Sequence, residues 1–433
     1  MEDSKLVIKL TKKKKGSFKK YINRITQSKR LKKIKNNLKN NKLLKDNNKI
    51  ETKKIDKNKQ NEISSSQKSF KKRNAGVDLL RIVVMLGIIY THILNRKAIF
   101  MYSQYKQKLD NSYTYVFYHN NAYGLISGIV GYKSTKYSNL LSLWLCVVFY
   151  SVGIRYYIKN IKHGNVEGEL YTEYYPVVYG RYWYFTSYFA MFMFLPAVNK
   201  GIQYLNKPEL KALVMSICGI FVIWQSFMNN KEDHFKMNGG MSTIWLLCLY
   251  IIGTYIGKYN VVYTGIKRYI FSFIYLFIFL FSCFIYNKYS NYTITYYRGN
   301  FKAKFKNYIK KLSTDNLICV IKVSQAISLA LFFLQLKYNK YLSKLITFVG
   351  PLTFAVYLMH DNSNMRNNYL NKIFEGESYN LTFNEVMRML ILKCTKIFLG
   401  CIIIEYLRHL LFTILQIRKI CIFIETIFFK IIS

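Results

Sequence analysis

Three ionisable residues lie in the first long apolar run of the chain: Asp78, Arg81 and His92. Ionisable side chains are costly inside a bilayer, so those found in an apolar run are candidates for a functional site. Arg81 and His92 are eleven residues apart, and eleven steps of about 100° return a helix to nearly the same direction. The three residues therefore share one helix face, with Arg81 and His92 about 16 Å apart along the axis. A permanent cation at one depth and a titratable imidazole at another indicate an active site that runs through a membrane.

The rest of the chain supplies apolar segments that can surround this face. Of the 433 residues, 51% are hydrophobic and 17% aromatic, and apolar stretches of about twenty residues recur after residue 72. Stretches of this length can cross a bilayer, so we expect an all-α polytopic membrane protein with about ten transmembrane helices. His119, Asn120 and Asn121 interrupt the second stretch and must face the bundle interior or a wet cavity. The expected spans are 76–94, 113–131, 138–158, 181–203, 209–228, 241–259, 266–286, 316–337, 345–361 and 384–407.

The two ends of the chain differ from the spans in composition. The formal charge of +44 is unevenly spread, because residues 1–73 alone hold 26 Lys and Arg against 6 Asp and Glu. Basic flanks stay on the cytoplasmic side, so we expect a multi-pass cell-membrane protein with a cytoplasmic N-terminus. Residues 1–72 form a low-complexity basic tail that is either solvated and disordered or bound to anionic lipid headgroups. Residues 416–433 are expected to lie in the membrane interface as an amphipathic helix, although a short eleventh span stays open.

The sequence gives no sign of a metal site or of a permanently bound cofactor. The eight cysteines lie in or beside apolar runs, and no pair has metal-site or redox spacing. Their expected role is that of buried packing thiols. The basic tail has few aromatic residues and no recognised nucleic-acid module, so we expect no nucleic-acid partner.

The spacing Asp78-x-x-Arg81 followed by His92 resembles the opening helix of the acyltransferase 3 family, whose members are integral-membrane O-acyltransferases of cell-surface carbohydrates. One such motif is weakly specific, but further segments resemble the family in the expected order. The similarity covers residues 73–415, which we expect to form an acyltransferase 3-like transmembrane domain. The further segments are the Ser-Gly turn in 125–132, the Trp-Tyr…Pro-x-x-Asn helix in 181–199, the Trp…Tyr-x-x-Gly helix in 245–259 and the Tyr-Leu-x-His helix in 352–361.

This chain departs from the family pattern in two respects. Many members carry an acidic residue just after the Trp of the fourth helix, whereas residues 184–188 contain none. The role of that acid is therefore not transferable to this chain. The sequence also has no second hydrolase-like domain with a Gly-Asp-Ser motif, so a delivery step that needs one must use a separate protein.

The resemblance implies transfer of an acyl group, usually acetyl, from acyl-CoA to a hydroxyl of a surface polysaccharide or its lipid-linked precursor. A hydroxyl becomes a good nucleophile when a base removes its proton, so His92 is expected to activate it or to accept the acyl group transiently. The resemblance implies acetyl-CoA as the donor. Arg81 keeps its charge and has a fork suited to phosphate, so it is expected to hold the diphosphate of this donor or to stabilise a developing negative charge. Asp78 is expected to fix Arg81. Alternatively, His92 is a hydrogen-bonded packing residue and Arg81 forms a structural ion pair with Asp78.

Three further residues are expected to bind substrate or cofactor: Arg181, Trp183 and His360. Arg181 and Trp183 lie at the entry of an expected span, where an arginine is also a routine interface anchor. His360 precedes Asp361 near the end of another span, and the pair either faces the cavity or is solvated.

Two other classes of function fit the same composition. A transporter or flippase of a lipid-linked oligosaccharide, or of a proton-coupled solute, also uses interior His and Arg residues. Against it stand the lack of a visible internal repeat and of paired Gly- or Pro-broken spans. A catalytically idle membrane scaffold is the third class.

Overall fold

Helices make up the part of the chain that the structure describes. The computed structural model describes residues 73–134, 136–227, 233, 235–259, 262–289 and 317–432, and gives only the backbone at 96 and 97. These ranges contain no strand, which confirms the expected all-α class. The chain divides between Lys72 and Arg73, and every described residue belongs to the second unit. The expectations for the basic tail of residues 1–72 fall outside the described residues.

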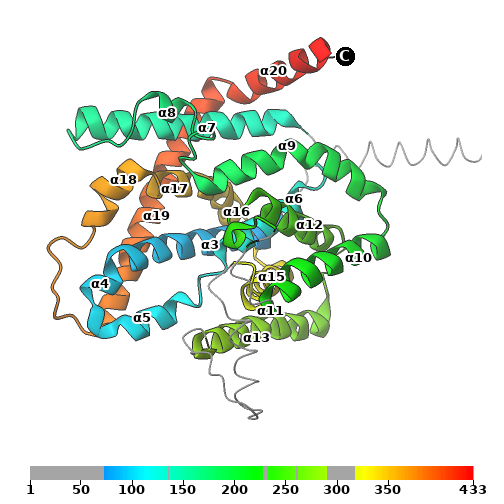
Figure 1. Cartoon of the computed structure of the whole chain (residues 1–433), viewed down its shortest axis with the longest axis horizontal. Coiled ribbons are helices and arrows are strands. Elements are labelled where there is room, and N and C mark those ends of the chain that lie inside the picture. Colours follow the sequence, from blue (N-terminus) through cyan, green and yellow to red (C-terminus); the bar gives the residue numbers. More distant parts are fainter. Residues whose placement is uncertain are drawn as a thin grey trace, which may run out of the picture. The chain divides into compact units, whose positions relative to one another are not determined.

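The helices follow one another with short connections, and several are extended by a π or 3-10 turn (Figure 1). The α-helices are α3 (Ala75–Ile93), α4 (Ile99–Met101), α5 (Lys106–Tyr113), α6 (His119–Gly131), α7 (Tyr137–Tyr156), α8 (Tyr171–Tyr174), α9 (Trp183–Tyr204), α10 (Lys207–Ile217), α11 (Gln225–Phe227), α12 (Thr243–Tyr259), α13 (Gly265–Tyr289), α15 (Val320–Gln335), α16 (Lys340–Val349), α17 (Thr353–His360), α18 (Ser363–Asn368), α19 (Phe383–Ile414) and α20 (Ile417–Ile432). The π segments are Leu94–Ala98, Tyr157–Ile161 and Cys218–Trp224, and the 3-10 segments are Ser103–Tyr105, Asn238–Gly240, Gly350–Leu352 and Leu370–Lys372.

Five of the ten expected spans correspond to helices that are long and apolar enough to cross a membrane. The other expected spans correspond to described helices that are shorter or less apolar. The chain is thus a membrane protein by its apolar helices, while ten crossings and a cytoplasmic N-terminus stay predictions. The five helices are Ala75–Ile93, Tyr137–Ile161, Gly265–Tyr289, Lys340–His360 and Phe383–Ile414.

The expected span 113–131 is wrong in its first part. Residues 114–118 form a turn, and the helix α6 begins only at His119. Two aromatic side chains of the turn pack against α13, Tyr118 against Phe279 with centroids 5.4 Å apart and Phe117 against Tyr286 with centroids 6.4 Å apart. Residues 114–118 are thus apolar enough to suggest part of a membrane span, although they form a turn and not a helix.

The helix α3 lies in the middle of the described unit and carries the residues on which the sequence analysis began (Figure 1). It contacts α6, α15, α16, α17 and α19. Asn74 caps its first turn by accepting hydrogen bonds from the backbone N–H groups of Gly76 and Val77. A Cβ at Gly76 would lie 2.2 Å from the carbonyl oxygen of Phe333 in α15, so glycine lets the two backbones meet. The start of α3 is therefore held by its own N-cap and by the close contact with α15.

The α6–α12 pair is the second close contact around α3, and small residues make it possible. A Cβ at Gly128 would lie 2.0 Å from the carbonyl oxygen of Tyr250, and one at Gly253 would lie 2.1 Å from that of Leu125. Helices in membranes approach closely where glycine removes the side chain. The Ser-Gly segment of the family motif lies inside α6 and lets α6 and α12 pack closely.

Replacing Gly128 with alanine should lower the thermal unfolding midpoint of the detergent-solubilised protein, because the new methyl group meets backbone atoms that cannot rotate away. Overpacking of this kind costs about 1–3 kcal/mol or more. Gly153→Ala is the matched control, since a Cβ at Gly153 in α7 meets nothing within 4 Å and alanine favours a helix. Equal midpoints for the two variants would contradict the close contact.

The chain ends in two helices that the sequence placed differently. The last expected span, 384–407, is a 32-residue helix that continues to Ile414. Residues 417–432 form α20, which packs against α7 at the top of Figure 1. An interfacial position for residues 416–433 stays a prediction.

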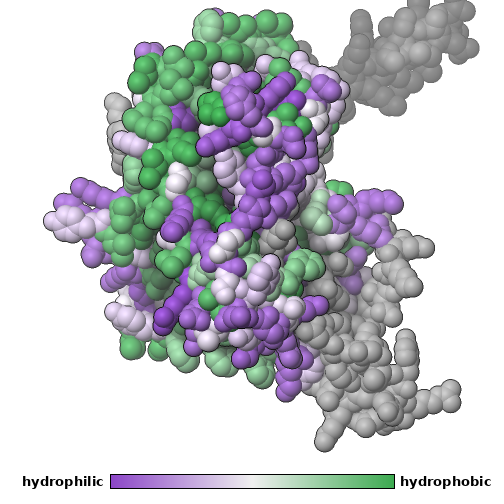
Figure 2. Space-filling view, turned by 90° about the vertical axis from the view of Figure 1, so that its left-hand side faces the viewer, coloured by the Kyte–Doolittle hydropathy of each residue, from purple (hydrophilic) through white to green (hydrophobic). Residues whose placement is uncertain are grey.

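The side of the unit on which α4, α5 and α18 lie carries much of the polar surface. Figure 2 shows this side, where hydrophilic side chains gather across the middle and hydrophobic side chains lie along the margins. The C-terminal end of α3 leads to α4 on the same side (Figure 1). His92 and His360 lie at the C-terminal ends of α3 and α17.

Candidate active site

His92 and His360 contact each other directly. His92 lies in the last turn of α3, and His360 is the last residue of α17. Nδ1 of His92 is 3.1 Å from Nε2 of His360, and it is 3.6 Å from Oδ1 of Asp361. His360 is only 4% exposed, so the expectation of a cavity-facing pair is favoured over a solvated one. The structure thus brings two of the six expected site residues into one cluster.

The hydrogen bonds determine which nitrogen of each neutral ring carries the proton. Nδ1 of His360 lies 2.6 Å from the carbonyl oxygen of Val356 and must donate to it, because a carbonyl only accepts. Nε2 of His360 therefore carries the lone pair and accepts from Nδ1–H of His92. The lone pair of His92 is then on Nε2. Proton uptake at Nε2 would place an imidazolium beside the carboxylate of Asp361, which stabilises it.

A cavity of about 60 Å³ lies beside this cluster. It is lined by His92 and Asp361, by His119 and Asn120 from the start of α6, and by Trp183 from the start of α9. The polar residues that the sequence required to face the interior or a cavity therefore do so. Trp183 lies where a substrate-binding residue would have to be.

His360 lines a second cavity, of about 530 Å³. Asn368, Tyr369 and Lys372 contribute polar groups to its wall. The pair of His92 and His360 thus separates the two cavities, with one imidazole lining each.

Arg81 lies in a separate cluster that shares a buried carboxylate. Asp78 is 1% exposed and accepts a hydrogen bond from Arg81, with Nη1 of Arg81 2.5 Å from Oδ1 of Asp78. It also accepts two hydrogen bonds of 2.9 Å from Arg73. The predicted pair of Asp78 and Arg81 is present, and two guanidinium groups around one carboxylate leave an excess positive charge. Such an excess suits an anionic ligand.

A third cavity, of about 250 Å³, is lined by both Arg73 and Arg81. It shares three lining residues with the cavity of His92: Tyr123, Tyr184 and Phe354. The two cavities therefore adjoin along an aromatic wall. Arg81 and His92, which share one face of α3, thus line neighbouring cavities.

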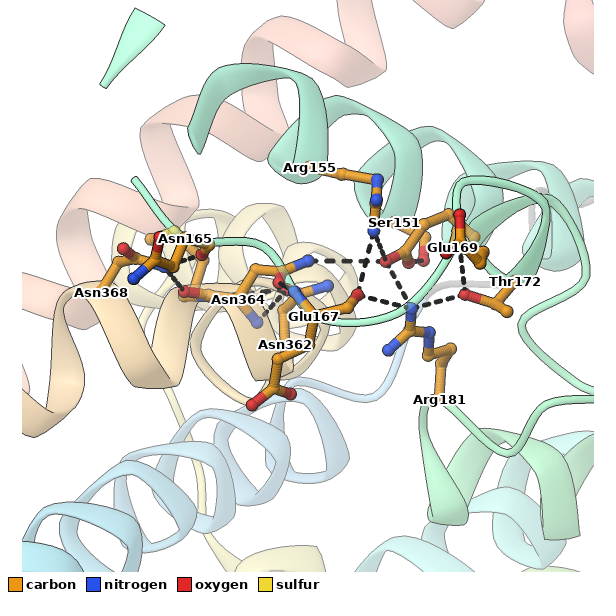
Figure 3. Close-up of polar contacts among 12 residues, drawn as sticks. Ser151, Arg155, Asn165, Glu167, Glu169, Thr172, Arg181, Asn362, Asn364 and Asn368 are labelled. Atoms are coloured by element: carbon orange, nitrogen blue, oxygen red, sulfur yellow. Dashed lines mark hydrogen bonds and ion pairs between the residues drawn. The ribbon is translucent and has the colours of Figure 1, made fainter. Parts of the chain in front are cut away.

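Arg181 has another environment than the sequence suggested. Its Nη2 is 2.8 Å from Oε1 of Glu173, a residue that is 1% exposed, and Nη2 also donates to the hydroxyl of Thr172. Arg155 from α7 approaches the same Glu173 oxygen at 3.7 Å, and Ser151 donates to the other (Figure 3). Arg181 is not among the residues that line the cavity of His92. Substrate binding by Arg181 stays a prediction, and its observed contacts are those of a structural ion cluster.

This ion cluster holds the loop of residues 162–182 against α7 and α18. Asn364 in α18 accepts from the backbone N–H of Glu167, with a distance of 2.8 Å (Figure 3). Its amide nitrogen lies 3.5 Å from Glu173. The loop leads directly into Trp183 and Tyr184, and α18 follows Asp361. The cluster therefore connects the two chain segments that deliver cavity residues.

The comparison with protein families bears on this site directly. The model of the acyltransferase 3 family, described as an acyltransferase domain, matches residues 74–392. The chain belongs to this family. The matched acyltransferase domain contains Asp78, Arg81 and His92, together with Arg181, Trp183 and His360, whereas Arg73 and α20 lie outside it. No curated protein and no solved structure matches the chain.

Several residues of this acyltransferase site were missed in the sequence. Asp361 was named only as the neighbour of His360, yet its carboxylate faces His92 across the fold. Arg73 was counted with the basic tail, although it lies two residues before α3 and donates to Asp78. Tyr184 and Tyr357 were quoted only as parts of motifs, and both line the cavity of His92. No spacing signal distinguishes them from the other tyrosines of the chain.

Proposed function

We propose that this membrane acyltransferase moves an acyl group, acetyl in the simplest case, from acyl-CoA to a hydroxyl of a surface polysaccharide or its lipid-linked precursor. One observation carries the proposal. The helix α3 presents a base, His92, and a cation, Arg81, to two cavities that share an aromatic wall. A thioester whose anionic part occupies one cavity can extend its acyl end into the other.

The donor is held by charge in this proposal. Arg73 and Arg81 surround the single carboxylate of Asp78, so their combined charge attracts the coenzyme A diphosphate. In this proposal the start of α3 lies on the cytoplasmic side, where acyl-CoA is made, as the basic composition of residues 1–72 predicts. Acetyl-CoA is a substrate, and the chain needs no permanently bound cofactor for the transfer.

His92 acts on the acceptor. The acceptor hydroxyl attacks the thioester carbonyl carbon, a C–O bond forms, and the hydroxyl proton passes to Nε2 of His92. The C–S bond then breaks, and the proton returns from His92 to the leaving thiolate. Asp361, 3.6 Å from the imidazole, stabilises the imidazolium between these two steps. The acceptor sugar enters the cavity of His92 in this proposal, where the ring of Trp183 offers a face on which a sugar can stack.

Purified protein in detergent, incubated with [14C]acetyl-CoA, tests the proposal. We expect release of coenzyme A, slowly with water as acceptor and faster with polysaccharide prepared from cells that lack the protein. Mass spectrometry of surface glycans from cells with and without the protein should show the acetyl mass. A transporter would leave the thioester intact, and an idle scaffold would leave the glycans unchanged.

Replacing Arg81 with glutamine should raise the KM for acetyl-CoA about 10- to 100-fold, because hydrogen bonds to charged groups contribute about 1.5–3 kcal/mol. Asp78 keeps Arg73 as its partner, so the fold should survive. Acetyl-pantetheine, a thioester without the diphosphate, is the control substrate, and its kinetics should be the same for both proteins. An equal loss with both substrates would contradict a role in diphosphate binding.

A further inference from the structure

His360 contacts His92 without lining the cavity that His92 lines. Nε2 of His360 lies 3.1 Å from Nδ1 of His92. The described residues that line the cavity of His92 do not include His360. From this position His360 can act on the base itself, and not on a substrate in that cavity.

Two groups lie near Nδ1 of His92, and their distances distinguish them. Oδ1 of Asp361 is 3.6 Å away, which is beyond the usual range of a hydrogen bond, whereas Nε2 of His360 is within that range. Asp361 also has a closer cationic partner, because Nη1 of Arg366 is 3.1 Å from the same Oδ1. The imidazole of His360, and not the carboxylate, is thus the group that accepts the Nδ1 proton of His92.

The ring of His360 is held in the orientation that this hydrogen bond requires. Its Nδ1 donates to the carbonyl oxygen of Val356, one turn earlier in α17, at 2.6 Å. The helix α17 packs against α3, α7 and α19, and Val356 and Leu358 are fully buried. A neutral imidazole has one donor and one acceptor nitrogen, so fixing Nδ1 of His360 as the donor makes Nε2 the acceptor.

An acceptor at Nδ1 determines how His92 can act as a base. The hydrogen bond keeps the proton of the neutral ring on Nδ1 and the lone pair on Nε2, and it restrains the orientation of the ring. The two ring centroids are 5.1 Å apart and the planes are inclined by 43°, so the rings meet through these nitrogen atoms and do not stack. A base must lie within hydrogen-bond reach of the proton that it removes, and a misplacement of about 1 Å can cost about 10²-fold in rate.

We propose that His360 is a positioning residue for acyl transfer, which holds His92 in the tautomer that has its lone pair on Nε2. This inference rests on the proposed function. When Nε2 of His92 takes the proton of the attacking hydroxyl, Nδ1–H continues to donate to His360. The proton leaves Nε2 for the thiolate as the C–S bond breaks, so His360 neither gains nor loses a proton. This role differs from the substrate contact that the sequence suggested for His360.

Two amide substitutions separate the positioning role of His360 from its role in the fold. In His360→Asn the amide nitrogen takes the position of Nδ1 and can still donate to Val356, but nothing takes the position of Nε2. In His360→Gln the amide oxygen can reach the position of Nε2 and accept from His92, but the donor to Val356 is lost. Each variant thus keeps one of the two hydrogen bonds and is the matched control for the other.

We expect His360→Asn to lower kcat for release of coenzyme A from [14C]acetyl-CoA by about 10²-fold, because His92 loses the partner that orients it. Its thermal unfolding midpoint should be close to that of wild type. His360→Gln should keep most of the wild-type kcat, although its midpoint should fall with the loss of the bond to Val356. The KM for acetyl-CoA should stay the same in both variants, since Arg73 and Arg81 line another cavity.

A purely structural role would give the reverse order, with the less stable glutamine variant also the less active one. Wild-type kcat in His360→Asn would overturn the proposal and leave Asp361 as the partner of His92. Activity that follows the unfolding midpoint in both variants would assign His360 to the fold alone. A raised KM for acetyl-CoA with unchanged kcat would assign it to substrate binding. Failure of the proposed function is distinct, because the wild-type protein would then release no coenzyme A from acetyl-CoA.

Discussion

Replacing His92 with alanine should lower the rate of acyl transfer about 10²- to 10⁴-fold, the range in which a positioned general base contributes. The change removes Nε2, the nitrogen that takes the acceptor proton. The measurement is kcat for release of coenzyme A from [14C]acetyl-CoA by purified protein. Loss of transfer in cells should follow, seen as loss of the acetyl mass on surface glycans.

His409→Ala is the matched control for His92. His409 is an exposed residue of α19, so its loss should leave kcat and the unfolding midpoint unchanged. Exogenous imidazole should restore part of the activity of His92→Ala, because the truncated side chain leaves room for it beside Asp361. Wild-type activity in His92→Ala would contradict the role of His92 as a general base. An acyl group found covalently bound to His92 of the wild-type protein would instead show that His92 carries the acyl group transiently.

The face of α3 could be predicted because it depends on one helix alone. The order of Asp78, Arg81 and His92 determines their common face once the segment is helical, and the three-residue spacing of the first two allows their ion pair. The family resemblance then placed the remaining motifs in order, and the family match agrees with it over residues 74–392.

The contact between His92 and His360 could not be predicted in this way. The two residues are 268 positions apart, and they meet because α3 and α17 pack side by side. His360 also needs the carbonyl oxygen of Val356 to fix its tautomer, which no spacing in the sequence expresses. The cluster is a product of tertiary packing.

The partner of Arg181 could not be predicted from the sequence either. Its position at the start of an expected span suggested an interface anchor or a substrate ligand, and the structure gives it Glu173 as a partner. The sequence contains three glutamates in that loop, Glu167, Glu169 and Glu173, and only burial distinguishes the last of them.

Replacing Glu173 with glutamine should destabilise the protein by about 3–5 kcal/mol, the cost of removing one partner from a buried ion pair. Glutamine keeps the shape of the side chain and removes the charge, so Arg155 and Arg181 are left without their shared carboxylate. We expect a marked fall in the thermal unfolding midpoint. Activity should fall as well, because the loop that contains Glu173 leads into Trp183 and Tyr184.

Glu169→Gln is the matched control in the same loop. The Glu169 side chain is exposed, and only its backbone carbonyl oxygen accepts hydrogen bonds, from Thr172. Exposed charges contribute little, so the midpoint of this variant should equal that of wild type. Equal midpoints for the two glutamine variants would contradict the buried ion cluster.

The double variant Glu173→Gln with Arg181→Gln separates charge from packing. If the cost of Glu173→Gln arises from an uncompensated guanidinium, removing one of the two guanidinium groups should recover part of the lost stability. The double variant should therefore be more stable than the sum of the two single changes predicts, by an interaction energy of about 0.5–3 kcal/mol. Strict additivity would mean that Glu173 stabilises the loop through its hydrogen bonds to Ser151 and Asn364, not through its charge.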